Sequence, residues 1–346
     1  MFYKIKKRVE QELKGYFLSI DKNYSLSRLS PVLFRNIEEF ILRKGKRIRP
    51  ALFVVGYLGY AKKAPAGLYR SALSWELLHD FLLVHDDIID KSDLRRGKPS
   101  MHAMLNRYLS GRKGLKFSGE DLTIVAGDVM YALALDAFLA VKEDMRRKEK
   151  ALKKLIRAAL LTGTGEFIEL LSGLKSLDEI GKEDIYRIYD YKTANYTFAS
   201  PLSMGATLAG APQADCRRLF DFGLCLGRAF QIKDDYLGLF AKESEIGKSV
   251  LTDLQEAKKT ILIWYAYKNT GRKDRLVIKS ILAKNKVGKT DLGRIRRVVR
   301  DCGGVRFAER QIKDLLQKAK TLNKRLLMRS PYKQALVSYA EELLKL

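Results

Sequence analysis

The spacing of apolar residues predicts a helical protein. Apolar positions recur at i, i+3 and i+4 along almost the whole chain, and the alternation typical of strands is absent. Only 7 of the 346 residues are proline, so few positions would interrupt a helix. The longest predicted helices cover residues 71–89, 121–141, 152–171, 184–208 and 216–239. We therefore expect a single all-α domain over residues 1–346.

Two longer connections interrupt this pattern, at Lys91–Tyr108 and at Phe240–Asp253. Each follows a stretch of carboxylates, and connections of this kind often carry functional residues. Beyond residue 251 the predicted helices are shorter and amphipathic, with breaks at Gly271, Gly288 and Gly303-Gly304. Because both connections share the order apolar helix, carboxylates, basic loop, we expect two half-sites that face each other across a helical bundle.

The charge of the chain favours anionic partners. The formal net charge is +26, from 66 Lys and Arg against 40 Asp and Glu, which fits nucleic acid, an acidic membrane surface or phosphorylated metabolites. The excess is spread over the whole length, however, and is equally typical of a basic surface. Cys216, Cys225 and Cys302 show no metal-ligand spacing and indicate a reducing compartment. With no apolar leader and no uncharged run of about 18 residues, we expect a cytoplasmic protein without a transmembrane segment.

The first acidic motif consists of Asp86, Asp87 and Asp90 at the end of a predicted apolar helix. On a helix, Asp86 and Asp90 share one face, about 6 Å apart along the axis. Neighbouring carboxylates are costly to bury unless cations neutralise them, and hard oxygen ligands suit Mg²⁺, which shares its remaining positions with water and phosphate. A solvated helix end is the alternative, and the preceding Leu82-Leu83-Val84 argues against it.

Basic residues near this motif predict an anionic ligand. Arg95 and Arg96 can each fork onto phosphate oxygens. Lys46 and Arg49 stand at the start of another apolar helix, whose N-terminus favours negative charge. Taken singly, each pair is also typical of a basic surface. His79 lies two turns before the first carboxylate on nearly the same face, where an ordinary core histidine is the other interpretation.

A second motif repeats this chemistry. Gln231, Asp234 and Asp235 are spaced i, i+3 and i+4, so they share a helical face. Further candidate phosphate contacts, each by itself no more informative than a surface lysine, are Lys192-Thr193, Lys248 and Lys258.

In combination, these motifs resemble the trans-isoprenyl diphosphate synthase (polyprenyl synthetase) family, and most of all its geranylgeranyl diphosphate synthases. The ordered matches are Gly45–Pro50, Asp86–Asp90, Arg95–Gly97, Lys192–Thr193, Gln231–Asp235, Gly247–Lys248 and Lys258–Thr260. The resemblance implies the isoprenoid synthase fold, a single large all-α bundle around a deep central cavity. It also implies a homodimer.

The resemblance implies a role for each matched residue. Several Mg²⁺ ions would bridge the diphosphate of an allylic substrate, and their implied ligands are Asp86, Asp87, Asp90, Asp234 and Asp235. The implied contacts of the same diphosphate are Arg95, Lys192 and Lys258, with Lys248 beside them. The positions implied to hold isopentenyl diphosphate are Lys46, Arg49, His79 and Arg96. Those implied to line the reaction centre are Thr193 and Gln231.

The implied reaction joins isopentenyl diphosphate to the allylic diphosphate. Metal and cationic groups stabilise the pyrophosphate that leaves C1 of the allylic chain. The isopentenyl double bond, held nearby, then attacks the allylic cation, and loss of a proton gives a product five carbons longer. Water must be excluded, because it would hydrolyse the cation.

Product length in this family is set by residues just before the first acidic motif. Phe81, five residues before Asp86, would lie about 7.5 Å deeper along the helix, where its ring would block a growing chain. Leu82 leaves no second aromatic barrier. This pattern resembles the C20 synthases; farnesyl or longer products, and ordinary core packing of Phe81, remain alternatives.

The chain departs from the family at Gly238, where many relatives have a third aspartate, which predicts weaker metal binding at the second motif. A regulatory subunit of a heteromeric synthase therefore stays open. A phosphohydrolase would need histidines from scattered helices, and the chain has only His79, His85 and His102 in one region. A terpene cyclase would carry a different second metal motif, and a nucleic-acid-binding protein would need a recognition module that the sequence lacks.

Overall fold

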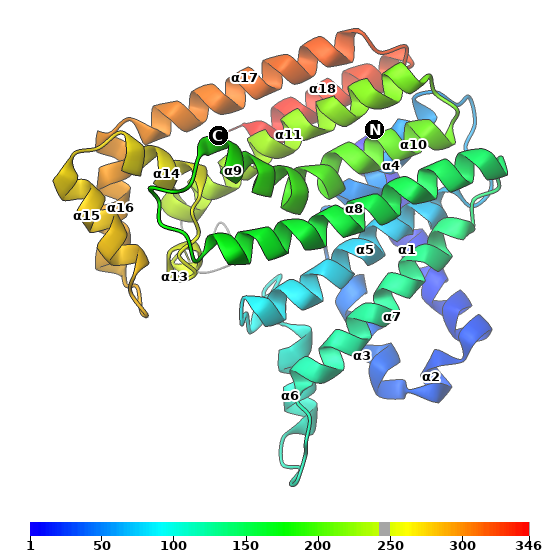
Figure 1. Ribbon diagram of the computed structural model, residues 1–346. Coiled ribbons are helices and arrows are strands. Elements are labelled where there is room, and N and C mark those ends of the chain that lie inside the picture. The colour runs from blue at the N-terminus through cyan, green and yellow to red at the C-terminus, as the bar shows by residue number, and fades with distance from the viewer. Residues whose placement is uncertain (242–249, 346) are drawn as a thin grey trace. The chain divides into compact units, whose positions relative to one another are not determined.

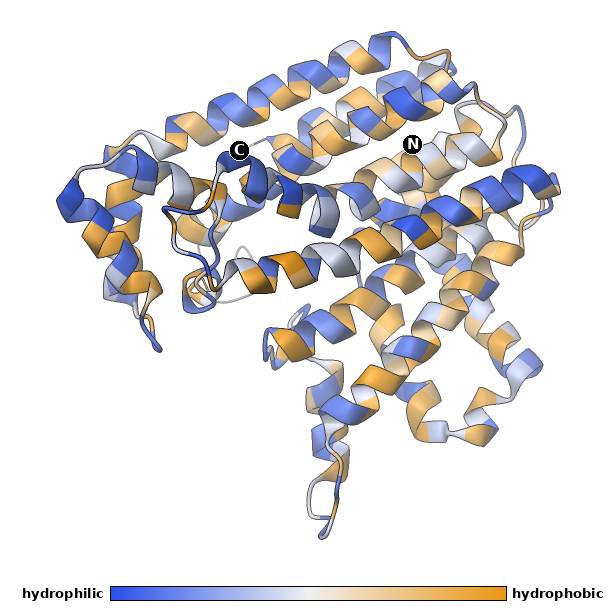
Figure 2. Ribbon diagram, viewed as in Figure 1, coloured by the Kyte–Doolittle hydropathy of each residue, from blue (hydrophilic) through white to orange (hydrophobic). Residues whose placement is uncertain are grey.

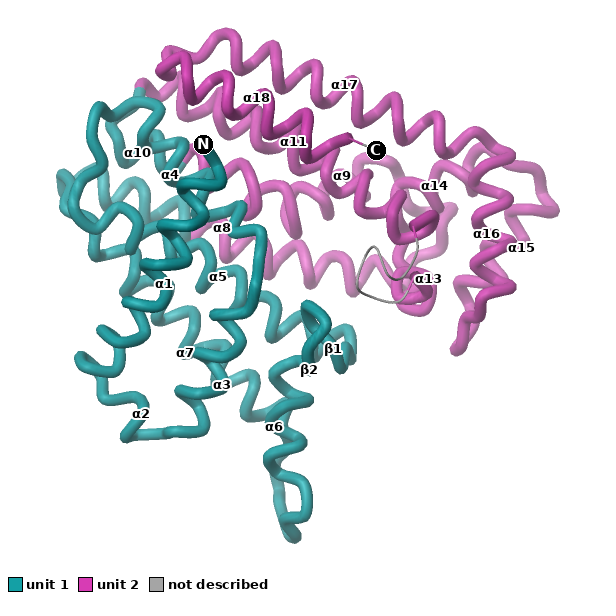
Figure 3. The backbone as a smooth tube through the Cα atoms, turned by 180° about the vertical axis from the view of Figure 1, so that it is seen from behind, with its two compact units in different colours: residues 1–155, 204–211 teal, residues 156–203, 212–346 magenta. Residues whose placement is uncertain are grey.

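The computed structural model describes residues 1–241 and 250–345. The chain divides into two compact units (Figure 3). Unit 1 holds residues 1–155 and 204–211, and unit 2 holds residues 156–203 and 212–346. The boundaries fall within or directly after helices α8 (Met145–Ser172) and α10 (Ser200–Leu208). The single domain that the sequence predicts stays a prediction.

Unit 1 is built mainly from the N-terminal helices (Figure 1). They are α1 (Phe2–Tyr24), α2 (Leu26–Leu29), α3 (Pro31–Leu42), α4 (Ile48–Leu58), α5 (Leu68–Ile89), α6 (Met101–Leu109) and α7 (Gly119–Leu139). A two-stranded antiparallel hairpin, β1 (Leu94–Arg95) and β2 (Lys98–Pro99), connects α5 to α6. No other strand occurs in the described part of the chain.

Unit 2 consists of helices alone within its described residues. Besides most of α8, they are α9 (Lys182–Ile188), η1 (Tyr189–Ala199), α11 (Gln213–Phe240), α13 (Thr252–Gln255), α14 (Ile261–Lys268), α15 (Arg272–Leu282), α16 (Lys289–Asp301), α17 (Gly304–Lys324) and α18 (Ser330–Leu344). η1 is a π-helix. The predicted all-α class is confirmed.

The core of unit 1 lies where α5 packs along α7. Most helices carry both polar and apolar residues, so each can bury one face (Figure 2). On α5 the side chains of Leu73, Trp75 and Leu77 are fully buried. Gly127 of α7 allows the close approach, because a Cβ there would lie 2.2 Å from Cε1 of His85. The two helices are thereby fixed beside the residues of the first acidic motif.

The core of unit 2 surrounds α11, which packs against η1 and α17. Two glycines of α11 touch η1 directly. A Cβ at Gly223 would lie 2.3 Å from Cα of Ala199, and a Cβ at Gly227 would lie 2.4 Å from Cα of Ala194. Since only glycine fits at this distance, these two positions set how closely η1 approaches the helix that carries the second acidic motif.

Two predictions about elements are wrong. The predicted connection Lys91–Tyr108 contains the β1–β2 hairpin and most of α6, whose buried residues Met101, Leu105 and Leu109 have a helical spacing hidden within a short polar segment. The single helix predicted over residues 184–208 is instead the succession α9, η1 and α10, because the backbone bonding widens to a π-helix in the middle.

By length and composition alone, α7 would suffice to cross a membrane. However, 44% of its most apolar stretch is buried inside the structure, and the helix packs against α5 and α6. A core helix meets the same criterion, so this observation is weak evidence for a membrane span.

Candidate active site

The first acidic motif lies at the C-terminal end of α5, in unit 1. Nε of Arg95 donates to Oδ1 of Asp87 at 2.6 Å, and Nη2 of Arg95 donates to Oδ2 of Asp86 at 3.2 Å. The Asp87 side chain is fully buried, whereas that of Asp86 is 24% exposed. Burial raises the pKa of Asp87, against the opposing charge of Arg95. Asp90 forms the C-cap of the helix. The structure therefore brings the predicted carboxylates and Arg95 together.

The hairpin after α5 separates Arg95 from Arg96. Arg96 and Gly97 form its two-residue turn, with φ of +57° and +72°. Positive φ at both positions matches the twist of the turn to that of the two strands. Whereas Arg95 reaches the acidic motif, Nη2 of Arg96 donates to Oδ1 of the fully buried Asp80 at 3.2 Å. Nη1 of Arg96 is buried and has no hydrogen-bond partner among the described residues. The two arginines thus serve different parts of unit 1.

A buried ion network lies beneath Arg96. Arg47, at the N-cap of α4 with φ of +52°, forms a hydrogen-bonded ion pair with Glu76 of α5, and both side chains are almost fully buried. Arg96 lies 3.7 Å from the same Glu76 carboxylate. Burial raises the pKa of Asp80 to about 8, with Glu76 adding to the effect. Arg47, Glu76 and Asp80 were not among the predicted site residues, although charged residues inside an apolar helix were a usable signal.

His79 lies within a strongly positive environment. Burial is the largest cause that holds its pKa well below the usual value, followed by the charges of Arg49, Arg96 and Arg95. Lys46, predicted together with Arg49, is exposed. A neutral imidazole surrounded by guanidinium groups is suited to an anion with many oxygen acceptors.

The second acidic motif lies on α11, in unit 2. Asp235 is 3% exposed, and its carboxylate accepts hydrogen bonds from the hydroxyl of Tyr189 and, at 3.1 Å, from Nε2 of Gln231. Oγ1 of Thr193 donates to Oε1 of Gln231 at 2.9 Å. Burial raises the pKa of Asp235 to about 8. Asp234 is half-buried. The predicted residues Thr193, Gln231 and Asp235 therefore form one hydrogen-bonded chain, which Tyr189 extends.

Lys192 is held on η1 by two glutamates of α8. Nζ of Lys192 lies 2.6 Å from Oε2 of Glu166 and 2.5 Å from Oε2 of Glu169. A Cβ at Gly165 would lie 2.7 Å from the backbone N of Lys192, so glycine permits this close approach. π-helical segments are frequent at functional sites. The glutamates were not predicted, because nothing in the sequence pairs α8 with η1.

Gly238 contacts the segment that follows the second motif. A Cβ at this position would lie 2.7 Å from Oδ2 of Asp253, so the Asp253 carboxylate occupies the space of the absent side chain. Nζ of Lys258 lies 2.5 Å from Oε2 of Glu256, and the Lys258 N–H donates to the carbonyl of Asp253 at 2.9 Å. The predicted Lys248 lies outside the described residues.

The predicted floor residue Phe81 contacts two other rings. Its centroid lies 4.9 Å from that of His85 and 5.2 Å from that of Tyr131 on α7. Phe81 and Leu82 are both half-buried. Tyr131 was not predicted, since it belongs to a helix far along the chain from Phe81.

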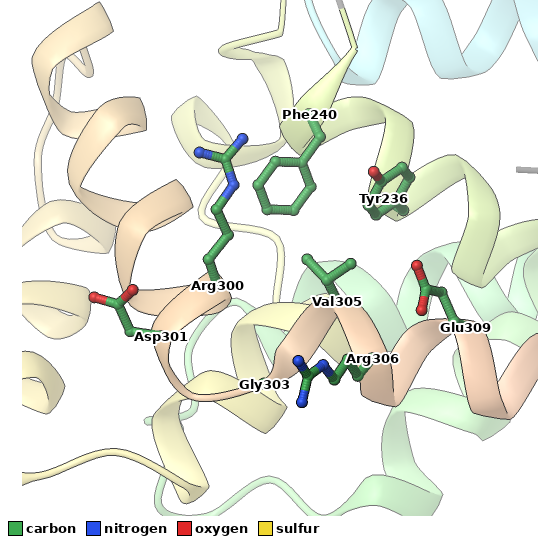
Figure 4. Close-up of a pocket in the computed structure, with 8 residues that line it drawn as sticks. All are labelled: Tyr236, Phe240, Arg300, Asp301, Gly303, Val305, Arg306 and Glu309. Carbon is green, nitrogen blue, oxygen red and sulfur yellow. The ribbon is translucent and has the colours of Figure 1, made fainter.

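Unit 2 also contains a cavity of about 560 Å³, located where α11 ends beside α16 and α17 (Figure 4). Its lining residues are Tyr236, Phe240, Arg300, Asp301, Gly303, Val305, Arg306 and Glu309. None of them was predicted as a site residue. The deep cavity that the resemblance implies stays a prediction.

The predicted metal ligands fit a hard cation only when other ligands complete its shell. Within the described residues, no three His, Cys, Asp or Glu side chains are placed to hold a metal ion by themselves. Mg²⁺ commonly takes one or two carboxylates and fills its remaining positions with water and phosphate oxygens. Oδ2 of Asp87 is buried without a hydrogen-bond partner in the described part of the chain. An oxygen donor set of this kind fits Mg²⁺ shared with a phosphorylated substrate.

Comparison with known proteins agrees with this chemistry. The family model for polyprenyl synthetase matches residues 30–299. A short chain isoprenyl diphosphate synthase from Methanothermobacter thermautotrophicus is 31% identical over 259 residues, which cover 75% of this chain and 74% of the relative. A geranylgeranyl diphosphate synthase from Sulfolobus acidocaldarius is 31% identical over 264 residues, covering 76% and 75%.

The fold has a close counterpart among solved structures. A geranylgeranyl pyrophosphate synthase from Corynebacterium glutamicum, solved with isoprenyl diphosphate and magnesium, superposes with a TM-score of 0.88 at 23% identity and covers 99% of this chain and 98% of that one. The chain therefore belongs to the polyprenyl synthetase family and is a trans-prenyltransferase.

Proposed function

We propose that this enzyme condenses isopentenyl diphosphate with an allylic diphosphate and stops at geranylgeranyl diphosphate. The observation that carries the proposal is the bridge from Arg95 to Asp86 and Asp87, because it joins a cation to carboxylates at the end of the apolar helix α5. A phosphate that shares Mg²⁺ with Asp86 and contacts Arg95 would be anchored at the same point.

We assign the allylic diphosphate to the two acidic motifs and to the cations near them. Mg²⁺, on which the family generally depends, would supply charge neutralisation for the leaving pyrophosphate, with Asp86, Asp87, Asp90, Asp234 and Asp235 as its ligands and several ions per site. Arg95, Lys192 and Lys258 add cationic contacts. Lys192 is already paired with Glu166 and Glu169, so it would exchange these carboxylates for substrate oxygens. Lys248 belongs to the same proposed set.

Isopentenyl diphosphate is assigned to the basic residues around His79. Lys46, Arg49 and Arg96 would contact its phosphates, with the ion pairs from Arg96 to Asp80 and Glu76 fixing one guanidinium. The C1–O bond of the allylic substrate breaks, its electrons leave with pyrophosphate, and the isopentenyl double bond forms the new C–C bond. A proton then leaves the condensed cation to restore a double bond. Thr193 and Gln231 would line this centre.

The product length is assigned to Phe81. Its ring is supported by Tyr131 and His85, so it cannot easily turn away from a growing chain. Leu82 adds no ring beside it. Relatives named as geranylgeranyl and geranylfarnesyl diphosphate synthases are 31% and 30% identical, so the choice of a C20 product rests on the Phe81 ring.

We also propose a homodimer. In unit 2, α8 exposes large apolar side chains at helical spacing: Ile156, Leu160, Phe167, Leu170 and Leu171. Exposed apolar side chains gathered on one face of a helix are typical of a protein–protein interface. Sedimentation equilibrium would test this, and a monomer at micromolar concentration would contradict it.

The activity is tested by incubating the chain with isopentenyl diphosphate, Mg²⁺ and each of the C5, C10 and C15 allylic diphosphates. We expect geranylgeranyl diphosphate as the main product by chromatography. Asp86→Ala should abolish elongation. If the wild-type chain elongates none of the three substrates, the reading as a regulatory subunit of a heteromeric synthase takes its place.

A further inference from the structure

The connection between α6 and α7 in unit 1 stands apart from the residues assigned to catalysis. Residues 110–117 are all exposed, and so are Arg107 and Tyr108 just before them. The connection extends beyond α6 and away from the other helices of unit 1 in both views of the backbone (Figures 1 and 3). We refer to residues 107–117 as the basic tip.

Both ends of the basic tip are firmly held. α6 packs on α7, and the first turn of α7 is fixed by a capping box between Ser118 and Asp121. Between these ends, Gly111 and Gly114 have φ of +81° and +72°, and a Cβ at either would meet no atom within 4 Å. The tip is therefore a turn raised on a rigid helical base.

The charge of the basic tip has one sign. Its four cations are Arg107, Arg112, Lys113 and Lys116, and no acidic residue occurs between Asp93 and Glu120. None of the four forms a salt bridge within the residues that the structure describes. The next acidic side chains along the chain are engaged locally, since Asp121 caps α7 and Glu120 accepts from Asn106 at 3.0 Å. The tip thus presents uncompensated positive charge to solvent.

Apolar side chains accompany these cations. Tyr108 is 46% exposed, Leu115 39% and Phe117 47%. The guanidinium of Arg112 lies 4.6 Å from the centre of the Tyr108 ring. Three large apolar groups beside four cations on a short exposed turn fit a partner that is apolar beneath an anionic surface.

We propose that the basic tip docks on the surface of an anionic lipid bilayer. Lys and Arg near such a surface are attracted to its acidic headgroups. Aromatic rings and leucine insert at the level where headgroups meet acyl chains. RNA would also attract the cations and stack on the rings, but it offers nothing to Leu115. The inference goes beyond the condensation reaction and does not depend on it.

The test compares two variants that lose the same charge. The tip variant is Arg112→Ser/Lys113→Ser/Lys116→Ser, and the control is Arg310→Ser/Lys313→Ser/Lys318→Ser on the exposed face of α17. Full-length protein is sedimented with vesicles of phosphatidylcholine, with or without phosphatidylglycerol. At about fivefold per basic residue, we expect the tip variant to bind the acidic vesicles roughly 100-fold more weakly, while wild type and control bind alike and neutral vesicles bind none of them.

The apolar part of the tip needs its own probe. The fluorescence of Phe117→Trp should shift to shorter wavelength with acidic vesicles and not with neutral ones. An equal loss of binding in both triple variants would reduce the effect to net charge and overturn the proposal. A wild-type protein that does not bind acidic vesicles would also overturn it. So would a tip variant that loses binding to single-stranded RNA but still binds the vesicles, because the tip would then be an RNA contact. A tip variant that elutes from size exclusion as a smaller oligomer than wild type would overturn it too, because the tip would then be a subunit contact. Condensation of dissolved substrates without vesicles should stay unchanged in both triples, and its loss in the tip variant would instead place the tip in the catalytic machinery.

Discussion

Shortening Phe81 tests the proposed control of product length. Phe81→Ala removes a ring that lies five residues before Asp86, and the next side chains down the helix are Leu78 and Leu77, both fully buried. Leu78 lies about 4.5 Å deeper along the axis. The space opened is therefore close to the reach of one more five-carbon unit, so we expect products longer than C20.

The substitution should leave the protein folded. A fully buried Phe→Ala change costs about 3–5 kcal/mol, but Phe81 is only half-buried. Its two ring contacts, to His85 and Tyr131, each add about 0.5–1.5 kcal/mol. Half of the burial cost together with the two ring contacts gives a loss of about 3–5 kcal/mol in the free energy of unfolding, so the assay is run at moderate temperature, where a domain of typical stability stays folded.

The assay is radiochemical: labelled isopentenyl diphosphate is incubated with the C15 allylic diphosphate, and the dephosphorylated products are separated by chain length. Phe34→Ala is the matched control, because Phe34 is a half-buried ring of unit 1 whose centroid lies 6.1 Å from that of Phe17. It should lose similar stability and keep the C20 product. Leu82→Phe should shorten the product, since it adds a ring one residue nearer the carboxylates.

An unchanged product from Phe81→Ala, with the variant folded and active, would refute the floor role. The same lengthening in Phe34→Ala would do so too, because it would trace the effect to general loosening of unit 1.

Three further changes test the residues that support the site. Tyr189→Phe removes the hydroxyl that binds Asp235. Because a buried polar group left without a partner costs about 1–3 kcal/mol, we expect a lower melting temperature. We also expect a higher Mg²⁺ requirement for activity. Gly127→Ala forces the His85 ring to move from a Cβ that would lie 2.2 Å away, and such overpacking should cost about 1–3 kcal/mol by thermal melting. The pKa of His79 is held well below its usual value in the folded chain, so the unfolded chain takes up a proton first as the solution is acidified. The free energy of unfolding therefore falls below about pH 6.5, by up to about 1.4 kcal/mol per pH unit. His79→Asn should flatten this fall between pH 7 and pH 5.

Each of these changes has a matched control. Tyr267→Phe removes a hydroxyl that donates to Asp178 near the surface, and it should leave the Mg²⁺ requirement unchanged. Gly293→Ala, with nothing within 4 Å of the added Cβ inside α16, should stabilise by about 0.5–1 kcal/mol. For the histidine, Gly293→Ala serves again, because it changes no titratable group, and it should keep the wild-type fall in stability on acidification. If Tyr189, Gly127 and His79 variants behaved like their controls, the packing arguments for the site would fail.

Helix periodicity was sufficient to predict the long elements of the fold. α5, α7 and α11 each begin and end within a few residues of the predicted bounds, because their apolar residues recur over many turns. The π-helix η1 could not be foreseen, since its residues follow the same apolar spacing as an α-helix. α6 was missed because a segment of 9 residues offers too few turns for periodicity to show.

The candidate site residues were easier to select from the sequence than the residues that contact them. Asp86, Arg95 and Asp235 stand out in the sequence because charge adjoins apolar runs. Glu76 and Tyr189 do not, since a single glutamate or tyrosine within a helix is ordinary. What makes them important is the partner that folding supplies, and partners far apart in the chain leave no local pattern.

At Gly238, a carboxylate from another part of the chain occupies the space of the missing aspartate side chain. The sequence predicts weaker metal binding there, yet the space of the absent side chain holds the carboxylate of Asp253, so a negative group still lies beside the end of α11. Restoring the family residue with Gly238→Asp would push two carboxylates together, and the added Cβ alone would lie 2.7 Å from Oδ2 of Asp253. We therefore expect this change to lower both the melting temperature and the activity, and Asp253→Asn to relieve the loss of stability in the double variant. A gain of Mg²⁺ affinity in Gly238→Asp alone, measured by calorimetry in the presence of a diphosphate, would contradict this argument, because the added carboxylate would then bind the metal despite Asp253.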